Sequence, residues 1–251
     1  MQERRTLVAP LNVNLHPLIR KLESIGPVAD DEKQAIVGLP MVLRDLGADQ
    51  DIVREQDPAS QCCLILDGFA CRYKILPSGK RQIFSFHIPG DIPDLQTLHL
   101  QVMDHNVGTL VPSKVAFISH EKVRTFLRTH LRIADVFWRD TLIEAAIFRE
   151  WMAGIGRRDA YARIAHLLCE LFLRLKAVGL THGDAYEMPI TQAELADSLG
   201  LSTVHVNRTL QQLRGSGIIS TSREKVVIRN WNKLQEAGEF DPTYLHLQES
   251  A

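Results

Sequence analysis

Hydrophobic and polar positions alternate in short runs over residues 41–118. Apolar or alternating segments (DIVRE, CCLIL, ACRYKIL, QIFSFHI and KVAFI) are separated by turn sequences such as DPAS, DG, PSGK and PGD. Short strands with Gly-containing turns between them are typical of an antiparallel barrel or sandwich. The pattern therefore predicts a β-domain here, with a hairpin loop at Pro77-Ser78-Gly79.

From about Ser119 the spacing of apolar residues becomes helical. Ser119 followed by HEKVRTFLRTH predicts a short capped helix, and a longer helix is expected from Arg132 to Ile155. Spacings of three and four residues there form a heptad seam made by Ala134, Trp138, Thr141, Ala145, Phe148, Met152 and Ile155. Such a seam favours a helix that pairs with its own copy. The alternative is a helix packed only against its own barrel.

Two glycines, Gly154 and Gly156, are expected to break this helix and form a hinge. The helical pattern restarts in RRDAYARIAHLLCELFLRLKAVG, which is followed by a predicted loop over Gly179–Gly183 and a short strand in YEMPI. We therefore place a domain boundary near residue 156.

Residues 191–220 predict two helices joined by a tight turn. Thr191-Gln-Ala-Glu194 is a capping box, and Gly200 permits the positive φ that a tight turn needs. Ser202 is expected to cap a second helix that buries Val206, Leu210 and Leu213. These spacings describe a helix-turn-helix, whose second helix normally lies in the major groove of DNA.

The outer face of the second helix distinguishes DNA reading from simple packing. A rotation of 100° per residue turns Val204, Arg208 and Gln211 outward, and residues 202–214 contain no acidic side chain. The segment GIISTSREKVVIR predicts a two-stranded wing that turns at Ser222–Lys225. The predicted DNA contacts are Thr191, Gln192, Ser202, Thr203, Val204, His205, Asn207, Arg208, Gln211, Ser222 and Arg223. A purely structural helix pair is the alternative.

Charge and composition indicate the expected compartment and class of the protein. The net charge of the 251 residues is −1, but residues 157–232 carry a net +3 and the last 19 residues a net −3. No apolar run reaches the roughly 18 residues that span a bilayer, and the N-terminal segment does not resemble a secretory signal. The four cysteines lack CxxC spacing, which predicts free thiols, no metal site and a cytoplasmic location. No catalytic site is predicted, so we do not expect an enzyme.

In this order the segments resemble the Crp/Fnr family of bacterial transcription regulators. LILDGFACRYKILPSGKRQIFSFHIPGD resembles the roll signature of the family, and ITQAELADSLGLSTVHVNRTLQQLRGSGIIS resembles its DNA-binding segment. The resemblance implies an α+β fold with a cyclic-nucleotide-binding-like β-roll (jelly roll), a dimerisation helix and a winged helix-turn-helix. The expected limits are a sensory β-roll domain at 1–130, helix and hinge at 131–156, a DNA-binding domain at 157–232 and an acidic tail at 233–251.

Departures from the family pattern bear on the effector. Cyclic AMP binders of the family have a Gly-Glu pair where this chain has Asp94 and Leu95. They also have an Arg-Ser or Arg-Thr pair where this chain has His105 and Asn106. A cyclic phosphate would lose its bidentate arginine here, which argues against cyclic AMP. The candidate effector pocket consists of Gly90, Asp91, Leu95, His105 and Asn106.

No cofactor is predicted. Residues 1–61 contain no cysteine, so an iron–sulfur cluster of the FNR type has no ligands there. Haem binding is kept as an alternative because His87, His99 and His105, which could ligate its iron, lie in the roll. Cys62, Cys63 and Cys71 are expected to be buried apolar thiols, with redox sensing as the alternative.

The sequence thus predicts a homodimer that reads an inverted repeat in double-stranded DNA, with RNA polymerase as a further partner and no membrane. The resemblance implies that Arg208 reads guanine, while Val204 replaces a family glutamate that accepts a hydrogen bond from cytosine. The alternative is a ligand- or redox-responsive scaffold protein that has such a roll and no DNA function. A cupin-like metalloenzyme is disfavoured because the roll contains only isolated histidines.

Overall fold

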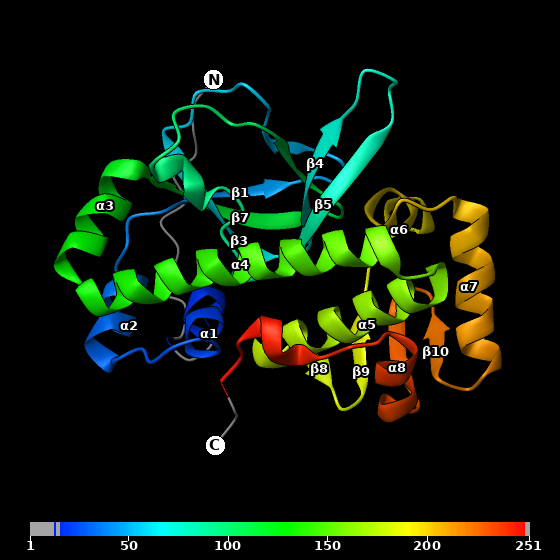
Figure 1. Cartoon of the computed structure of the whole chain (residues 1–251). Helices are drawn as coiled ribbons and strands as arrows, with labels where there is room; N and C mark the ends of the chain where they lie inside the picture. The colour runs from blue at the N-terminus through cyan, green and yellow to red at the C-terminus, as the bar shows by residue number, and fades with distance from the viewer. Residues whose placement is uncertain (1–12, 14–15, 249–251) are drawn as a thin grey trace. The chain divides into compact units, whose positions relative to one another are not determined.

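The chain forms two compact units (Figure 1). The structure, a computed structural model, describes residue 13 and residues 16–248. Unit 1 contains the described residues up to Lys74, residues 86–142 and Gln248, and unit 2 contains residues 75–85 and 143–247. The long helix α4 (Leu131–Arg157) contributes residues to both units.

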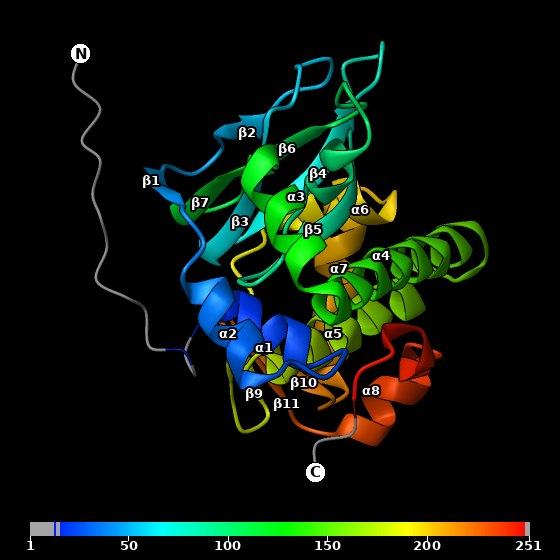
Figure 2. The same cartoon turned by 90° about the vertical axis from the view of Figure 1, so that its left-hand side faces the viewer.

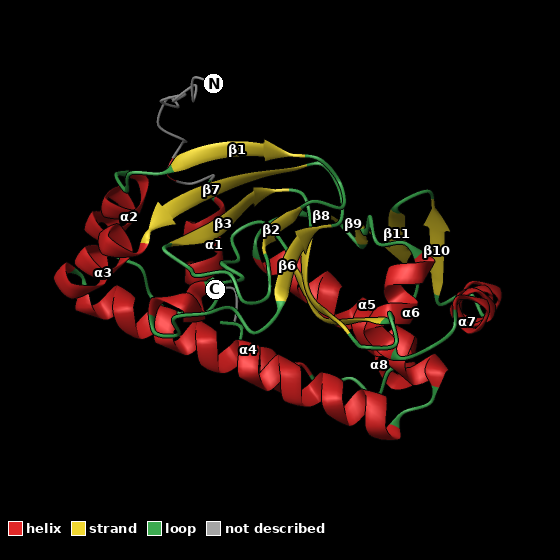
Figure 3. Ribbon diagram, turned by 90° about the horizontal axis from the view of Figure 1, so that it is seen from above, coloured by secondary structure: helices red, strands yellow, loops and turns green. Residues whose placement is uncertain are grey.

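Two sheets form the roll, with strand orders β1-β7-β3 and β2-β6-β4-β5 (Figure 3). The strands are β1 (Val42–Leu46), β2 (Asp51–Val53), β3 (Gln61–Asp67), β4 (Ala70–Ile75), β5 (Arg81–His87), β6 (Asn106–Thr109) and β7 (Ser113–Ser119). All five apolar runs singled out in the sequence form strands, whereas β1 and β6 were not predicted. The core cluster consists of Cys63, Ile65, Ala70, Val115 and Phe117.

The predicted hairpin loop joins β4 to β5. The amide of Gly79 donates to the carbonyl of Leu76 over 2.8 Å, and the amide of Leu76 donates to the carbonyl of Lys80 over 2.8 Å. Gly79 has a φ of 78°, which only glycine adopts without strain. The turn chemistry of PSGK therefore fixes this hairpin as expected.

Short helices cover part of the roll. The helices α1 (Pro17–Glu23) and α2 (Asp30–Val37), which the sequence pattern did not reveal, lie side by side (Figures 1 and 2). The 3-10 helix η2 (Leu95–Leu98) follows β5, and α3 (His120–Thr129) follows β7. The amide of Lys122 donates to the side chain of Ser119, so the predicted cap of α3 is confirmed.

The long helix runs further than predicted. Gly154 and Gly156 lie inside α4, which ends only at Arg157, so the expectation that they break the helix is wrong. The amide of Arg158 still donates to the carbonyl of Gly154, and the Arg158 guanidinium donates to Glu150 over 2.6 Å. A helical glycine costs only about 1 kcal/mol relative to alanine, and these contacts offset it. None of the helices in the described part of the chain is long and apolar enough to cross a membrane.

In unit 2, helix α5 (Ala160–Ala177) is capped by Asp159, whose carboxylate accepts a hydrogen bond from the amide of Ala162. A sheet of order β10-β11-β9-β8 follows, with β8 (Thr181–His182), β9 (Ala185–Glu187), β10 (Ile219–Ser222) and β11 (Lys225–Ile228). The helices α6 (Gln192–Leu199) and α7 (Thr203–Gly215) lie between β9 and β10 in the chain. β8 falls within the predicted loop, and β9 begins one residue before YEMPI and covers only its first part.

The C-terminal segment differs from the acidic tail expected from residue 233 onward. Helix α8 (Trp231–Ala237) crosses that limit, and η3 (Pro242–Leu245) follows it. Phe240 and Leu245 are buried, and the ring of Tyr244 stacks on His166 of α5 with 5.7 Å between centroids. The apolar residues interspersed among the acids of this segment explain why it folds onto α5.

Candidate nucleic-acid interface

The first helix of the pair begins at the predicted capping box. The amide of Glu194 donates to the Thr191 hydroxyl over 3.2 Å, and the amide of Thr191 donates to the Glu194 carboxylate over 2.7 Å. These reciprocal bonds satisfy backbone donors that a helix start otherwise leaves without partners. They fix the residue at which α6 begins, Gln192, whose side chain is exposed.

The turn between the helices is set by Gly200. Its φ is 65°, and the amide of Leu201 then closes the turn by donating to the carbonyl of Ala196 over 3.1 Å. Ser202 accepts from the amide of His205 over 3.2 Å and caps α7. The sequence therefore predicted the geometry of the turn correctly.

α7 has one buried face and one exposed face. Val206, Leu210 and Leu213 are buried, as predicted. Val204, by contrast, is 68% exposed, and Arg208 and Gln211 are also exposed. An apolar side chain left this open, beside a guanidinium and an amide and with no acidic residue on the helix, suits contact with base edges and phosphates.

A chain of amide hydrogen bonds organises this exposed face. The amide nitrogen of Gln211 donates to the amide oxygen of Asn207 over 3.0 Å, and the amide nitrogen of Asn207 donates to Gln192 over 3.1 Å. These contacts join the start of α6 to the middle of α7. The sequence placed all three residues in the interface but did not indicate that they bind one another.

The wing is a tight hairpin beside α7. Ser222 pairs with Lys225 at its end. The exposed Arg223 at the tip has a backbone φ of 52°, a conformation that residues other than glycine and asparagine seldom adopt. Arg214 donates to the Thr221 hydroxyl over 3.1 Å, and Arg229 donates to Ser220 over 3.0 Å. Arg214 and Arg229, two basic residues of this segment, therefore also hold the wing in place.

All predicted DNA contacts lie in unit 2, and all but one are exposed. Thr191 and Gln192 lie at the start of α6, Ser222 and Arg223 at the wing tip, and the others on α7 or its cap: Ser202, Thr203, Val204, His205, Asn207, Arg208 and Gln211. Asn207 is half-buried by its amide contacts. Their role in binding DNA stays a prediction.

Side chains of the candidate effector pocket make contacts within the roll. Asp91 is buried, pairs with Lys21 of α1 over 3.2 Å and accepts from the amide of Ile88. The Asn106 oxygen accepts from the amide of Glu55, and its nitrogen donates to the carbonyl of Tyr73. These contacts give Asp91 and Asn106 structural roles that the sequence did not indicate.

The remaining pocket residues have different surroundings. Gly90 has a φ of 102°, and a Cβ there would come within 2.6 Å of the carbonyl oxygen of Pro17. Leu95 and His105 are half-buried, and the His105 ring contacts Asp104 over 2.6 Å. Asp94 accepts from the amide of Cys63 over 2.7 Å. Their assignment to an effector pocket stays a prediction.

The cysteines of the roll are buried, as expected. Cys62, Cys63 and Cys71 are at most 1% exposed. Burial, assisted by the Asp94 charge, raises the pKa of Cys62 to about 12 and that of Cys63 well above its ordinary value. Because the thiolate is the reactive form, these thiols are poor nucleophiles in this structure.

The predicted seam of α4 is uncovered. Trp138 is 65% exposed, Phe148 53% and Met152 63%. Thr141 and Ala145 are exposed and Ala134 is half-buried, whereas Ile133, Val136, Phe137, Ile143 and Ile147 are buried. The helix thus has two apolar faces, and only one of them is packed within the chain.

Two domain families match the chain. The cyclic nucleotide-binding domain matches residues 43–130, and the Crp-like helix-turn-helix domain matches residues 162–237. The chain is 24% identical to the transcriptional activator protein FnrL of Cereibacter sphaeroides over 218 residues, which is 84% of this chain and 86% of FnrL. It is 27% identical to the nitrogen fixation regulation protein FixK of Bradyrhizobium diazoefficiens over 176 residues, 68% of this chain and 71% of FixK.

A solved structure agrees with these matches. FixK2 from Bradyrhizobium japonicum superposes with a TM-score of 0.72 at 26% identity, covering 79% of this chain and 98% of FixK2. The two domain families occur in the expected order, and relatives that regulate transcription match most of the chain. The chain therefore belongs to the Crp/Fnr family of transcription regulators.

Proposed function

We propose that the protein is a homodimeric regulator that binds an inverted repeat in promoter DNA and acts by binding rather than catalysis. The observation that carries this proposal is the exposed, acid-free face of α7 with Val204, Arg208 and Gln211, flanked by the wing. A helix of this kind enters the major groove, and the wing tip then lies near the phosphate backbone.

Arg208 is the residue expected to specify a base. A guanidinium that donates two hydrogen bonds to the O6 and N7 of guanine discriminates against other bases by about 1–3 kcal/mol. Val204 lies one turn earlier on the same face and packs on a thymine methyl. Each half-site is therefore expected to contain a guanine facing Arg208 and to favour thymine facing Val204.

Dimerisation is supported by the uncovered seam of α4. A contiguous apolar line that includes Trp138, Phe148 and Met152 is costly to leave in water, and a second copy of the same helix would cover it. A twofold axis would then relate two α7 helices, which read half-sites about one helical turn apart. An inverted repeat follows from this symmetry.

The proposed regulation uses neither cyclic AMP nor an iron–sulfur cluster. Asp94, Leu95, His105 and Asn106 stand where the family's cyclic-nucleotide contacts would be, and Asp94 is already bound to the amide of Cys63. RNA polymerase is the expected partner at the promoter, and the cytoplasm is the expected compartment. Three relatives that match the chain are named as a transcriptional activator, a probable transcriptional activator and a transcriptional activatory protein, which favours activation.

Selection from random DNA duplexes tests this function. Protein purified both with and without oxygen is expected to enrich an inverted repeat, and Arg208→Ala is expected to weaken binding to it by about 5- to 150-fold. Arg128→Ala, at an exposed position on α3 in unit 1, serves as the matched control and is expected to bind like the wild type. Failure to enrich any sequence under either condition, or equal affinity of Arg208→Ala, would overturn the proposal.

A further inference from the structure

A cleft in unit 1 shares no residue with the predicted DNA contacts, the seam of α4 or the candidate effector pocket. It has a volume of about 350 Å³, within the range of pockets that hold small molecules. Its walls come from the segment before β3, from η2 and the loop after it, and from the first turns of α3. The lining residues are Ala59, Ser60, Thr97, Leu98, His99, Leu100, Gln101, His120 and Arg124.

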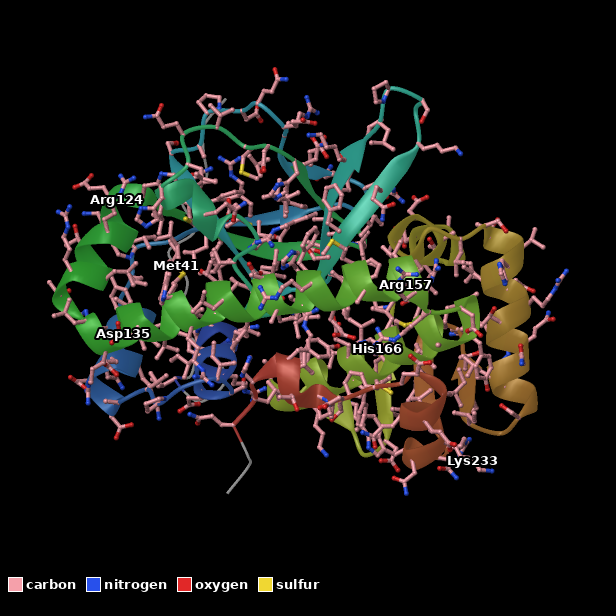
Figure 4. All side chains as sticks on the ribbon, viewed as in Figure 1. Met41, Arg124, Asp135, Arg157, His166 and Lys233 are labelled. Carbon is pink, nitrogen blue, oxygen red and sulfur yellow. The ribbon has the colours of Figure 1, made fainter. Side chains whose placement is uncertain are left out.

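The ionisable groups of this cleft are all basic. Its ionisable lining residues are Arg124, His120 and His99, and no acidic residue lines it. Arg124, labelled in Figure 4, donates to the carbonyl of Leu98 over 2.5 Å, which holds the guanidinium at the cleft. A guanidinium has five N–H donors, and this contact uses one of them.

His120 forms a buried wall of the cleft, being 6% exposed. The hydroxyl of Thr97 donates to the carbonyl of Asp94 over 2.6 Å, and its oxygen lies 2.9 Å from Nε2 of the His120 ring. Burial and the charge of Arg124 lower the pKa of His120. A neutral imidazole beside a guanidinium leaves the positive charge of the cleft without a counterion in its lining.

Two acidic residues that lie close in sequence to the lining, Asp94 and Glu121, do not supply this counterion. The carboxylate of Asp94 accepts from the amide of Cys63 on β3, and Glu121 is exposed on α3 and does not line the cleft. Leu98 and Leu100 contribute apolar surface, and Leu100 is 52% exposed although it lines the cleft. The lining therefore combines a cation with apolar side chains.

We propose that this cleft binds a small organic anion, whose carboxylate or phosphate group pairs with Arg124 and whose apolar part lies against Leu98 and Leu100. The proposal is independent of DNA binding. Because Thr97 lines the cleft and donates to Asp94, and Asp94 accepts from the amide of Cys63, an occupant lies next to the hydrogen bonds that link η2 to β3. The roll would thus sense an anion at a surface distinct from the candidate effector pocket.

Calorimetric titration of the full chain with simple probes tests this site. Phenyl phosphate and benzoate represent the two kinds of anion, inorganic phosphate supplies charge alone, and benzyl alcohol supplies the apolar group alone. We expect saturable binding of at least one organic anion, at least about tenfold tighter than either partial probe, because both kinds of contact contribute. Binding of neither organic anion at millimolar concentration would overturn the proposal.

Variants locate the binding. Arg124→Gln is expected to weaken the bound anion at least about tenfold, because it removes a charge-assisted hydrogen bond. Arg128→Gln, four residues further along α3 and exposed, keeps the charge change but leaves the cleft intact and is expected to bind like the wild type. If both variants weaken anion binding equally, or if neither weakens it, the site is contradicted. As a second readout, the ring signals of His120 are expected to shift on binding in the wild type.

Discussion

The hydroxyl of Tyr244 donates a hydrogen bond to the carboxylate of Glu170 over 2.9 Å and so ties the C-terminal 3-10 turn to α5. Glu170 is fully buried and also accepts from Trp151 of α4 over 2.9 Å and from Arg174 over 3.2 Å. His166, labelled in Figure 4, contacts the same hydroxyl over 3.0 Å. A buried carboxylate with three donors joins α4, α5 and the C-terminal segment within unit 2.

Removing the Tyr244 hydroxyl tests this junction. Tyr244→Phe leaves the Glu170 charge with one donor fewer, so we expect a loss of about 1.5–3 kcal/mol in the free energy of unfolding. Urea denaturation followed by circular dichroism measures it. Tyr161→Phe, at a half-buried position on α5, is the control and should change stability by less than about 0.5 kcal/mol. Equal stability of the two variants would contradict the role assigned to Tyr244.

His166 makes this junction sensitive to acid. Burial lowers its pKa below the ordinary value of 6.5, the charge of Arg158 lowers it further, and the Gly238 carbonyl, Glu170 and Glu150 oppose the shift. The folded chain thus binds this proton less tightly than the unfolded chain does. The contribution of neutral His166 to stability is therefore present above about pH 6.5 and is lost as the pH falls below it.

The expected effect is a loss of stability on the acid side that depends on His166. Between about pH 6.5 and 5.5, His166→Gln should reduce this loss by up to about 1.4 kcal/mol per pH unit. Urea titrations at the two pH values measure it, and His182→Gln, at an exposed position in the same unit, should behave like the wild type. An acid-side slope unchanged by His166→Gln rules out this assignment.

The fold was predictable where local chemistry sets the backbone. The Thr191 capping box, Gly200 and the Ser202 cap each satisfy neighbouring backbone groups, and they formed as predicted. Helix α4 continues through Gly154 and Gly156, against expectation, because contacts such as that of Arg158 with Glu150, eight residues earlier, outweigh glycine's weak helix propensity.

Other features have no local signature at all. The helices α1 and α2 are stabilised by packing and ion pairs such as Lys21 with Asp91, which no periodicity reveals. The cleft at Arg124 is assembled from three segments far apart in the sequence, so only the tertiary structure brings its residues together. The same holds for the junction of Tyr244 with Glu170, which are 74 residues apart.

Two glycines should respond oppositely to alanine. A Cβ on Gly238 would lie 2.6 Å from the amide nitrogen of His166, so Gly238→Ala must displace the C-terminal segment, with an expected loss of about 1–3 kcal/mol. Gly156 is inside α4 with open space around its Cβ position, so Gly156→Ala should stabilise the chain by about 0.5–1 kcal/mol. Thermal and urea unfolding of both variants provide the measurement. Destabilisation by Gly156→Ala would show that this position needs glycine for a reason other than space.

The exposed Val204 is expected to set the base preference next to the Arg208 contact. Val204→Glu introduces a carboxylate that accepts a hydrogen bond from the N4 of cytosine, so the preferred base should change from thymine to cytosine by about 1–3 kcal/mol. Selection from random duplexes with both proteins measures the change. Val204→Ala should lower discrimination without creating a preference for cytosine. A requirement for cytosine already present in the wild type would be incompatible with this interpretation.

The seam of α4 gives the sharpest test of assembly. In a dimer, Trp138→Glu places two carboxylates beside each other in an apolar interface. The Kd of the dimer should therefore rise at least about 30-fold, which is the effect of losing an interface hot spot of ~2 kcal/mol. Sedimentation equilibrium measures the dissociation, and affinity for a full inverted repeat should fall with it, because each monomer then binds one half-site. Ala153→Glu, an exposed position beside the seam, is the control and should remain dimeric. A wild-type chain that sediments as a monomer would leave the exposed Trp138, Phe148 and Met152 in need of another partner.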